Sequence, residues 1–145
     1  MAKSEGQKLK LLYILKWLSE RTDESHAMSG QEIIRALEQE GITAERKSIY
    51  SDIQALRDFG YDIITTKKRE NSGYYMASRD FELAELKLLV DAVQSSKVIT
   101  AKKSKGLIEK LEKLTSIHDA KQLQRQVYVS ERNKNSNESI YYSVD

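Results

Sequence analysis

Two helical patterns separated by only a few residues constrain the fold of this chain more than any other feature: one at 29–41, and one that contains Ile49, Ile53 and Leu56 and stops at Gly60. Ser29 and Glu32 form the S-x-x-E capping box that begins the first helix, and Gly41 is placed to end it. Because the second helix starts almost at once, the two helices must meet at a sharp angle. The sequence therefore predicts a helix-turn-helix pair.

Apolar residues recur in these segments at the spacing of one helical face. The positions predicted to be buried in the pair are Ile33, Ile34, Leu37, Ile49, Ile53 and Leu56. A preceding helix, at 7–20, shows the same spacing in Leu11, Ile14, Leu15 and Leu18. Its lysines, Lys8, Lys10 and Lys16, are placed on the other faces. Three amphipathic helices are therefore expected to share one core.

A β-branched run follows the second helix of the pair and indicates a short hairpin. Gly60 ends the helix, the first strand lies at 61–66, and a charged loop is predicted at 67–72. The second strand carries Tyr74 and Tyr75, which alternate across it, so one is expected to pack inward as core and the other to face outward. A helix-turn-helix followed by such a hairpin is a winged helix-turn-helix.

The rest of the chain predicts helices and then one strand. The predicted elements are a helix at 83–95, a helix opened by Thr100, a helix at 116–125, a strand at 127–129, a polar linker at 131–139 and an apolar segment at 140–142. Leucine stripes in these helices either pack back on the winged domain or form an interface with a second copy. We favour pairing, because most helix-turn-helix proteins bind as dimers.

The predicted fold class is therefore mainly α with a small β-hairpin wing. It is a winged helix-turn-helix domain at 1–79 followed by an α-helical linker and dimerisation region at 80–127.

Composition excludes several classes of function. The 145 residues are 32% charged and contain no apolar run of membrane length and no N-terminal secretory signal, so we expect a cytoplasmic protein without membrane contact. Cysteine is absent, and His26 and His118 therefore have no thiolates with which to complete a zinc site. No glycine-rich phosphate loop or nucleophile motif appears. We expect no metal, no cofactor and no enzymatic activity.

Polar residues on the second helix of the pair are the candidates for contact with double-stranded DNA. A helix fits the major groove, where arginine and lysine donate hydrogen bonds to guanine. The candidate residues of this recognition helix are Arg46, Lys47, Ser48, Tyr50 and Ser51. The candidate residues of the wing, suited to phosphates, are Thr65, Thr66, Lys67, Lys68 and Arg69. The short turn, the narrow apolar stripe and the basic wing together favour DNA over a merely solvated polar face.

The net charge is only +2, so DNA affinity is expected to depend on these few placed cations and on dimerisation.

The chain also resembles the N-terminal portion of bacterial WYL-domain transcriptional regulators. The resemblance runs through KLLYILKWL, SIYSDIQALRDFGYDI, GYYMASRDFELAELKLLVDAVQSSKVIT and KQLQRQVYV, and FELAELKLLVDAVQSSK is its most specific part. It implies a homodimeric transcription factor with its recognition helix at 45–59 and its wing at 61–77. It also implies that 128–145 begins the connection to a C-terminal WYL sensor domain, whose effector ligand changes operator binding.

The Trp-Tyr-Leu motif that names the family is absent from this sequence. We therefore expect an N-terminal piece of a longer regulator, and the sensing function is assigned to no residue here. Two alternatives remain open: a winged helix used for protein–protein contacts, and a regulatory domain attached to a larger enzyme. The low net charge favours the first. The sequence indicates neither the operator nor whether binding represses or activates.

Overall fold

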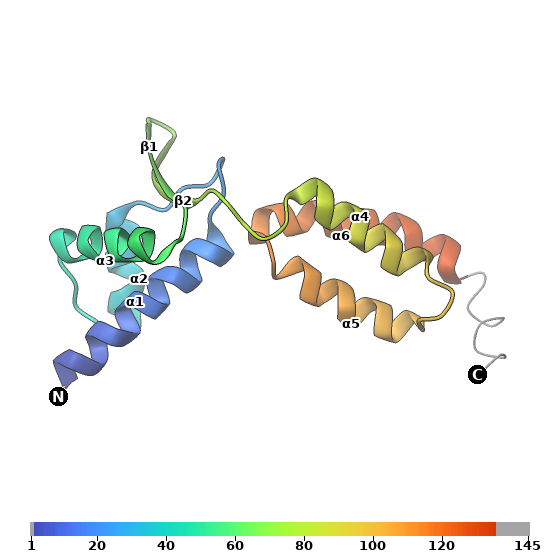
Figure 1. Ribbon diagram of the computed structural model, residues 1–145, viewed down its shortest axis with the longest axis horizontal. Coiled ribbons are helices and arrows are strands. Elements are labelled where there is room, and N and C mark those ends of the chain that lie inside the picture. The colour runs from blue at the N-terminus through green and yellow to red at the C-terminus, as the bar shows by residue number, and fades with distance from the viewer. Residues whose placement is uncertain (1, 136–145) are drawn as a thin grey trace. The chain divides into compact units, whose positions relative to one another are not determined.

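The computed structural model describes residues 2–135, which form a mainly helical, winged helix-like fold with one small hairpin (Figure 1). The chain divides into two compact units, residues 1–78 and the remainder from Arg79 onward. The first unit contains α1 (Ala2–Arg21), α2 (Gly30–Gln39), α3 (Arg46–Phe59), β1 (Ile63–Lys68) and β2 (Asn71–Met76). The second contains α4 (Leu83–Ser95), α5 (Ala101–Glu112) and α6 (Ile117–Asn135). The predicted fold class is confirmed.

Local sequence signals determine where α2 and α3 begin and end. The Glu32 amide donates to Ser29 Oγ at 3.1 Å and the Ser29 amide donates to Glu32 Oε1 at 3.2 Å, which confirms the capping box. Gly41 and Gly60 follow α2 and α3 with φ of +77° and +129°, values that glycine adopts without steric cost. The turn between the helices is short, as predicted, so α2 and α3 pack closely at an angle.

The core of the first unit collects apolar side chains from all three helices, from the segment before α2, from the turn between α2 and α3 and from the base of the hairpin. Its buried members are Ile14, Trp17, Leu18, Met28, Ile33, Leu37, Ile42, Ile49, Ile53, Leu56, Ile63 and Met76. Burial of such a side chain contributes roughly 1.5–3 kcal/mol, so this core holds the unit together.

Two of the buried residues described in this unit are not apolar, Thr22 and Lys10. Lys10 of α1 was expected on a polar face, but it is 1% exposed and its Nζ lies 3.1 Å from Asp52 Oδ2 of α3. Its position explains the burial, because Lys10 precedes Ile14 by four residues and Leu18 by eight, in the same stripe. The placement of Lys10 outside the apolar stripe was therefore wrong.

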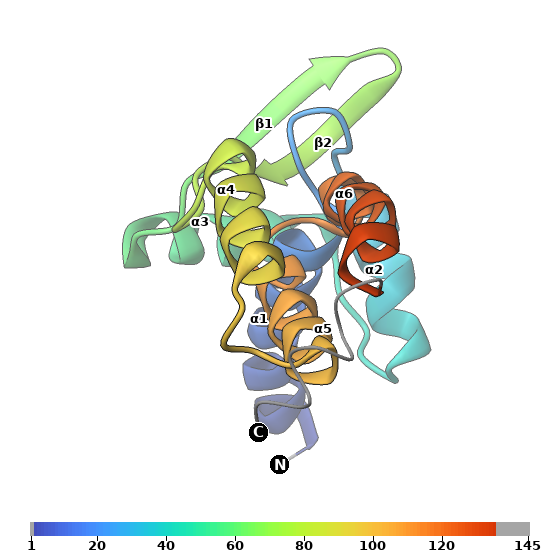
Figure 2. The ribbon, with the colours of Figure 1, turned by 90° about the vertical axis from the view of Figure 1, so that its right-hand side faces the viewer.

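The hairpin is longer and tighter than the sequence indicated. Strands β1 and β2 pair antiparallel from Ile63 opposite Met76 to Lys68 opposite Asn71. The predicted charged loop at 67–72 is therefore wrong: only residues 69–70 form the turn, and the lysines before them continue the strand. Charged side chains at a hairpin end are solvated whether they lie in a strand or in a loop, so charge did not mark the boundary. Figure 2 shows both strands projecting beyond the helices of their unit.

The second unit is a group of three helices around a small core of Leu86, Val90, Ile108 and Leu123. Each helix begins at a cap. Thr100 accepts a hydrogen bond from the Lys103 amide at 3.2 Å, and Ser116 accepts one from the Asp119 amide at 3.1 Å. The predicted starts of all three helices are confirmed.

The end of the last helix differs from expectation. The strand predicted at 127–129 is wrong, because α6 continues to Asn135 through that segment and the first part of the predicted linker. Val127 follows Leu123 by four residues and packs on the same core, so tertiary packing outweighs the weak strand preference of its β-branched neighbours. No glycine or proline follows Gly106 to stop the helix. The apolar segment predicted at 140–142 lies outside the described residues.

Candidate nucleic-acid interface

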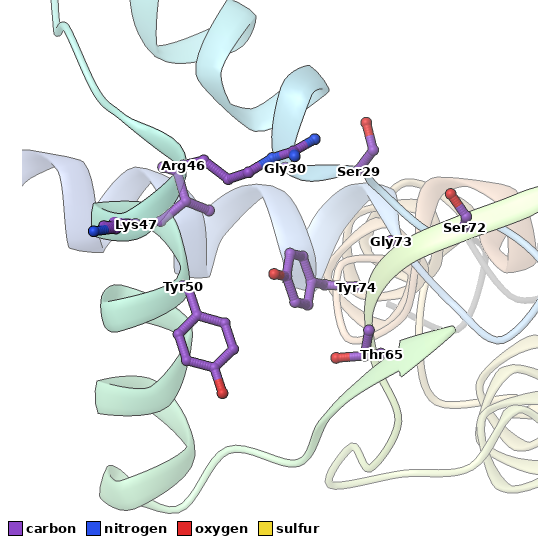
Figure 3. Close-up of a pocket in the computed structure, with 10 residues that line it drawn as sticks. Ser29, Gly30, Arg46, Lys47, Tyr50, Thr65, Ser72, Gly73 and Tyr74 are labelled. Atoms are coloured by element: carbon purple, nitrogen blue, oxygen red, sulfur yellow. The ribbon is translucent and has the colours of Figure 1, made fainter. Parts of the chain in front are cut away.

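A groove of about 520 Å³ lies in the first unit, between the start of α2, the first half of α3 and the hairpin. Its lining residues are Ser29, Gly30, Arg46, Lys47, Ile49, Tyr50, Thr65, Ser72, Gly73 and Tyr74. Figure 3 shows Arg46 and Tyr50 on the side of α3 that faces Tyr74 and Thr65 of the hairpin, whereas the end of the Lys47 side chain points away from them. Three elements that are separate in sequence therefore form one concave surface.

The first half of α3 supplies the cationic wall of the groove. Arg46, Lys47 and Tyr50 are all exposed, and 56% of the Tyr50 surface is accessible to solvent. Tyr50 follows Arg46 by four residues and Lys47 by three, so it lies beside both on the helix surface, while Ile49 and Ile53 turn toward the core. These exposed donors can reach a ligand without any rearrangement of the helix.

The other two candidates on α3 are placed differently. Ser48 is half-buried, and its hydroxyl donates to Glu45 O at 2.8 Å and accepts from the Glu45 amide at 3.3 Å. Ser48 therefore caps the helix. Ser51 is exposed, one turn beyond Lys47, and does not line the groove.

The candidates on the hairpin divide between its two faces. Thr65 and Lys67 lie on the face of buried Ile63, which turns toward the groove, whereas Thr66 and Lys68 lie on the opposite face. Of the five candidate residues of the wing, Thr65 alone lines the groove. Lys67, Lys68 and Arg69 are exposed toward the tip, and none of the three forms a salt bridge with another residue of the described part. They are available to an anionic partner at a distance from α3.

Arg57 connects α3 to the hairpin, a role that the sequence did not reveal. Its Nε donates to Ile63 O at 2.7 Å and its Nη2 donates to Thr65 Oγ1 at 2.9 Å. Arg57 follows Tyr50 by seven residues, two helical turns, so it lies on the groove side of α3. The spacing was visible in the sequence, but the acceptors on β1 were not.

The segment before α2 holds the other edge of the hairpin. Met28 and Tyr74 exchange backbone hydrogen bonds of 2.9 and 2.8 Å. The Asn71 side chain accepts from the Ala27 amide at 2.6 Å and donates to Glu24 O at 2.8 Å. The hairpin is therefore fixed along both edges, by α3 on one side and by this segment on the other.

The two tyrosines of β2 lie on opposite faces of the hairpin, as expected, but the inner one does more than pack against the core. Tyr74 packs against the core and also lines the groove, opposite Thr65 in the strand pairing. Tyr75 lies on the other face of the hairpin, opposite Ile64. Ser72, Tyr74 and the start of α2 are thus additions to the candidate surface that sequence reasoning missed.

Metal sites and membrane-spanning helices were also sought in the described part of the chain. Within residues 2–135, no three His, Cys, Asp or Glu side chains come together in a way that could hold a metal ion. None of the helices there is long and apolar enough to cross a membrane. No family model, curated protein or solved structure matches this chain.

Proposed function

We propose that this chain binds double-stranded DNA sequence-specifically and acts as the DNA-reading part of a transcriptional regulator of the WYL-domain type. The observation that carries the proposal is the groove, in which the exposed Arg46, Lys47 and Tyr50 of α3 stand beside a hairpin fixed to the same helix. A single helix fills the major groove of B-DNA, and its first residues contact the base edges.

The hairpin supplies the second part of the contact. With α3 in the major groove, cations at 67–69 are suited to the phosphates beside it, since lysine and arginine near a duplex neutralise phosphate charge and release counterions. Base contacts from α3 would give the specificity, and phosphate contacts from the hairpin would give affinity and orientation.

We further propose that the regulator acts as a homodimer in the cytoplasm and has no enzymatic activity of its own. Two copies would place one α3 in each of two half-sites, about one helical turn apart. In regulators of this type an effector ligand alters operator binding, and that function belongs to no residue described here.

The test is selection of bound sequences from random duplex DNA by the full chain. Enrichment of an inverted repeat is expected, because two symmetric copies read two half-sites. The variant Arg46→Ala/Lys47→Ala should lose the enrichment, whereas Arg35→Ala, a change of an exposed arginine of α2, should retain it. Absence of any enriched sequence with the native chain contradicts the proposal.

A winged helix used for protein–protein contacts is the second candidate, and the net charge of +2 favours it. That function predicts no salt-dependent affinity for duplex DNA. Titration of a labelled duplex at two salt concentrations distinguishes the two candidates.

A further inference from the structure

The ion pair between Lys10 and Asp52 is unusual because it lies inside the first unit. Lys10 is 1% exposed, the side chain of Asp52 is 19% exposed, and Nζ and Oδ2 are 3.1 Å apart. Lysine is almost never fully buried, since removal of its charge from water is costly. The attraction between the two charges barely offsets that cost, and a well-packed apolar pair would stabilise the contact equally well or better. Stability alone therefore does not account for the pair.

The pair joins α1 to α3 at a point where it can fix the position of one helix relative to the other. Lys10 continues the buried stripe of α1, one turn before Ile14, and Asp52 lies beside the core stripe of α3, between Ile49 and Leu56. Apolar side chains can adjust to a small shift of one helix along another, whereas a buried charge must stay within reach of its counter-ion. Asp52 Oδ2 has no hydrogen-bond partner in the described part of the chain, so only Lys10 Nζ, 3.1 Å away, compensates its charge. Single buried polar groups are known to set helix register in this way.

The register of α3 determines where the groove residues lie. Asp52 is on one flank of the core stripe, and Tyr50 and Arg46 are on the other flank, so α1 holds α3 from the side opposite the groove. One residue along a helix corresponds to 1.5 Å and 100° of rotation. A shift of that size would move Arg46 away from the base edge that it contacts.

We infer that Lys10 and Asp52 are positioning residues that set the register of the recognition helix and thereby its discrimination between DNA sequences. This inference rests on the proposed DNA-binding function. The pair itself touches no ligand and acts through α3.

The test compares two double variants of the full chain with the same change in charge. Lys10→Met/Asp52→Leu replaces the pair by apolar side chains of similar size. Lys8→Met/Asp58→Leu makes the same replacements at exposed positions of the same two helices. If the first variant unfolds below room temperature, Lys10→Met/Asp52→Asn takes its place, because Asn has the shape of Asp and Met is only one atom shorter than Lys.

With DNA, the ratio of affinities for the selected site and for a single-base variant of that site is measured. We expect the pair variant to lose about tenfold or more of this ratio while its midpoint temperature of unfolding stays at or above the native value. The exposed control variant should keep both the affinity ratio and the midpoint temperature of the native chain. A folded pair variant that discriminates as well as the native chain overturns the inference.

Without DNA, amide resonances of α3 report the register directly. The pair variant should show two sets of resonances, or exchange-broadened ones, at 46–50, not merely the shifted single set that a local effect of the nearby Asp52 substitution would give. The control should show one set. A single sharp set in the pair variant also overturns the inference. If the native chain selects no DNA sequence, the proposed function fails, and the resonances still decide whether the pair sets the register.

Discussion

Replacement of Gly73 by alanine is expected to destabilise the first unit selectively. A Cβ at this position would collide with the backbone carbonyl of Met28, and Gly73 has a φ of +133°. A side chain at such a φ costs roughly 1–3 kcal/mol. The collision also pushes β2 away from Met28 and so weakens the two backbone hydrogen bonds between Met28 and Tyr74, which contribute about 0.5–1.5 kcal/mol each. The sum is roughly 2–6 kcal/mol, a large part of the 5–15 kcal/mol that stabilises an ordinary domain.

The chain carries its own probe for this measurement. Trp17 is the only tryptophan and is 4% exposed in the core of the first unit, so its fluorescence during urea titration reports that unit. Gly41→Ala is the matched control. Gly41 has a φ of +77°, but no atom lies within 4 Å of a Cβ added there, so this substitution destabilises the unit only through the strained backbone conformation. Gly106→Ala, in α5, should leave the Trp17 transition unchanged. Equal losses of stability in Gly73→Ala and Gly41→Ala would refute the close approach of β2 to Met28.

Four further outcomes are expected. Arg57→Met should lower the free energy of unfolding, measured by Trp17 fluorescence, by about 1.5–3 kcal/mol, since it removes one part-buried hydrogen bond of a charged group, to Ile63 O, and an exposed one, to Thr65 Oγ1, that adds little. Arg46→Ala should weaken operator binding in gel-shift titration by about 1–3 kcal/mol and relax the preference at one base position. Alanine at all of 67–69 should weaken binding to every sequence alike and reduce the slope of log K against log salt by about 1 for each phosphate that is no longer neutralised. Leu88→Glu should weaken dimerisation in analytical ultracentrifugation without unfolding, because Leu88 is 70% exposed on α4.

Each of these outcomes has a result that contradicts it. An unchanged urea midpoint for Arg57→Met would mean that the hairpin does not depend on α3. A loss of affinity for Arg46→Ala that is equal on all sequences would assign Arg46 to phosphates instead of bases. An unchanged salt slope would remove the residues at 67–69 from the interface. A native chain that sediments as a monomer at high concentration would refute pairing, and equal effects of Leu88→Glu and Val98→Glu, a change at an exposed loop position, would place the interface elsewhere.

Features that depend on near neighbours in sequence were predictable. The capping box at Ser29, the glycine ends of α2 and α3, and the caps at Thr100 and Ser116 each involve residues within four positions of one another. Local sequence therefore contained both partners of every such contact. The order of helices and the position of the wing followed from them.

Features that depend on distant partners were not predictable. Arg57 and Tyr74 owe their places in the groove to backbone atoms of β1 and of the segment before α2. Lys10 was placed on a polar face because periodicity treats every lysine as polar, although its spacing from Ile14 put it in the buried stripe. Its counter-ion, Asp52, lies on another helix and was not predictable. The prediction of a strand at 127–129 failed for the same reason. Val127 packs on a core that is formed mostly by residues of α4 and α5, far from it in sequence.

The anchoring of the hairpin bears on how a chain with a net charge of only +2 could bind a polyanion. Arg57 and the Met28–Tyr74 hydrogen bonds fix β1 and β2 relative to α3, so the separation between the cations on α3 and those at the wing tip is set before any ligand arrives. A preorganised surface avoids the entropy cost of ordering its side chains and loops on binding. A few cations held at fixed spacing can therefore contribute as much affinity as a larger number on a mobile segment. By this reasoning the loss of Arg57 should reduce DNA affinity although Arg57 is not among the proposed contact residues. The reduction should be smaller when the wing cations have already been removed, because both changes act through the same contact.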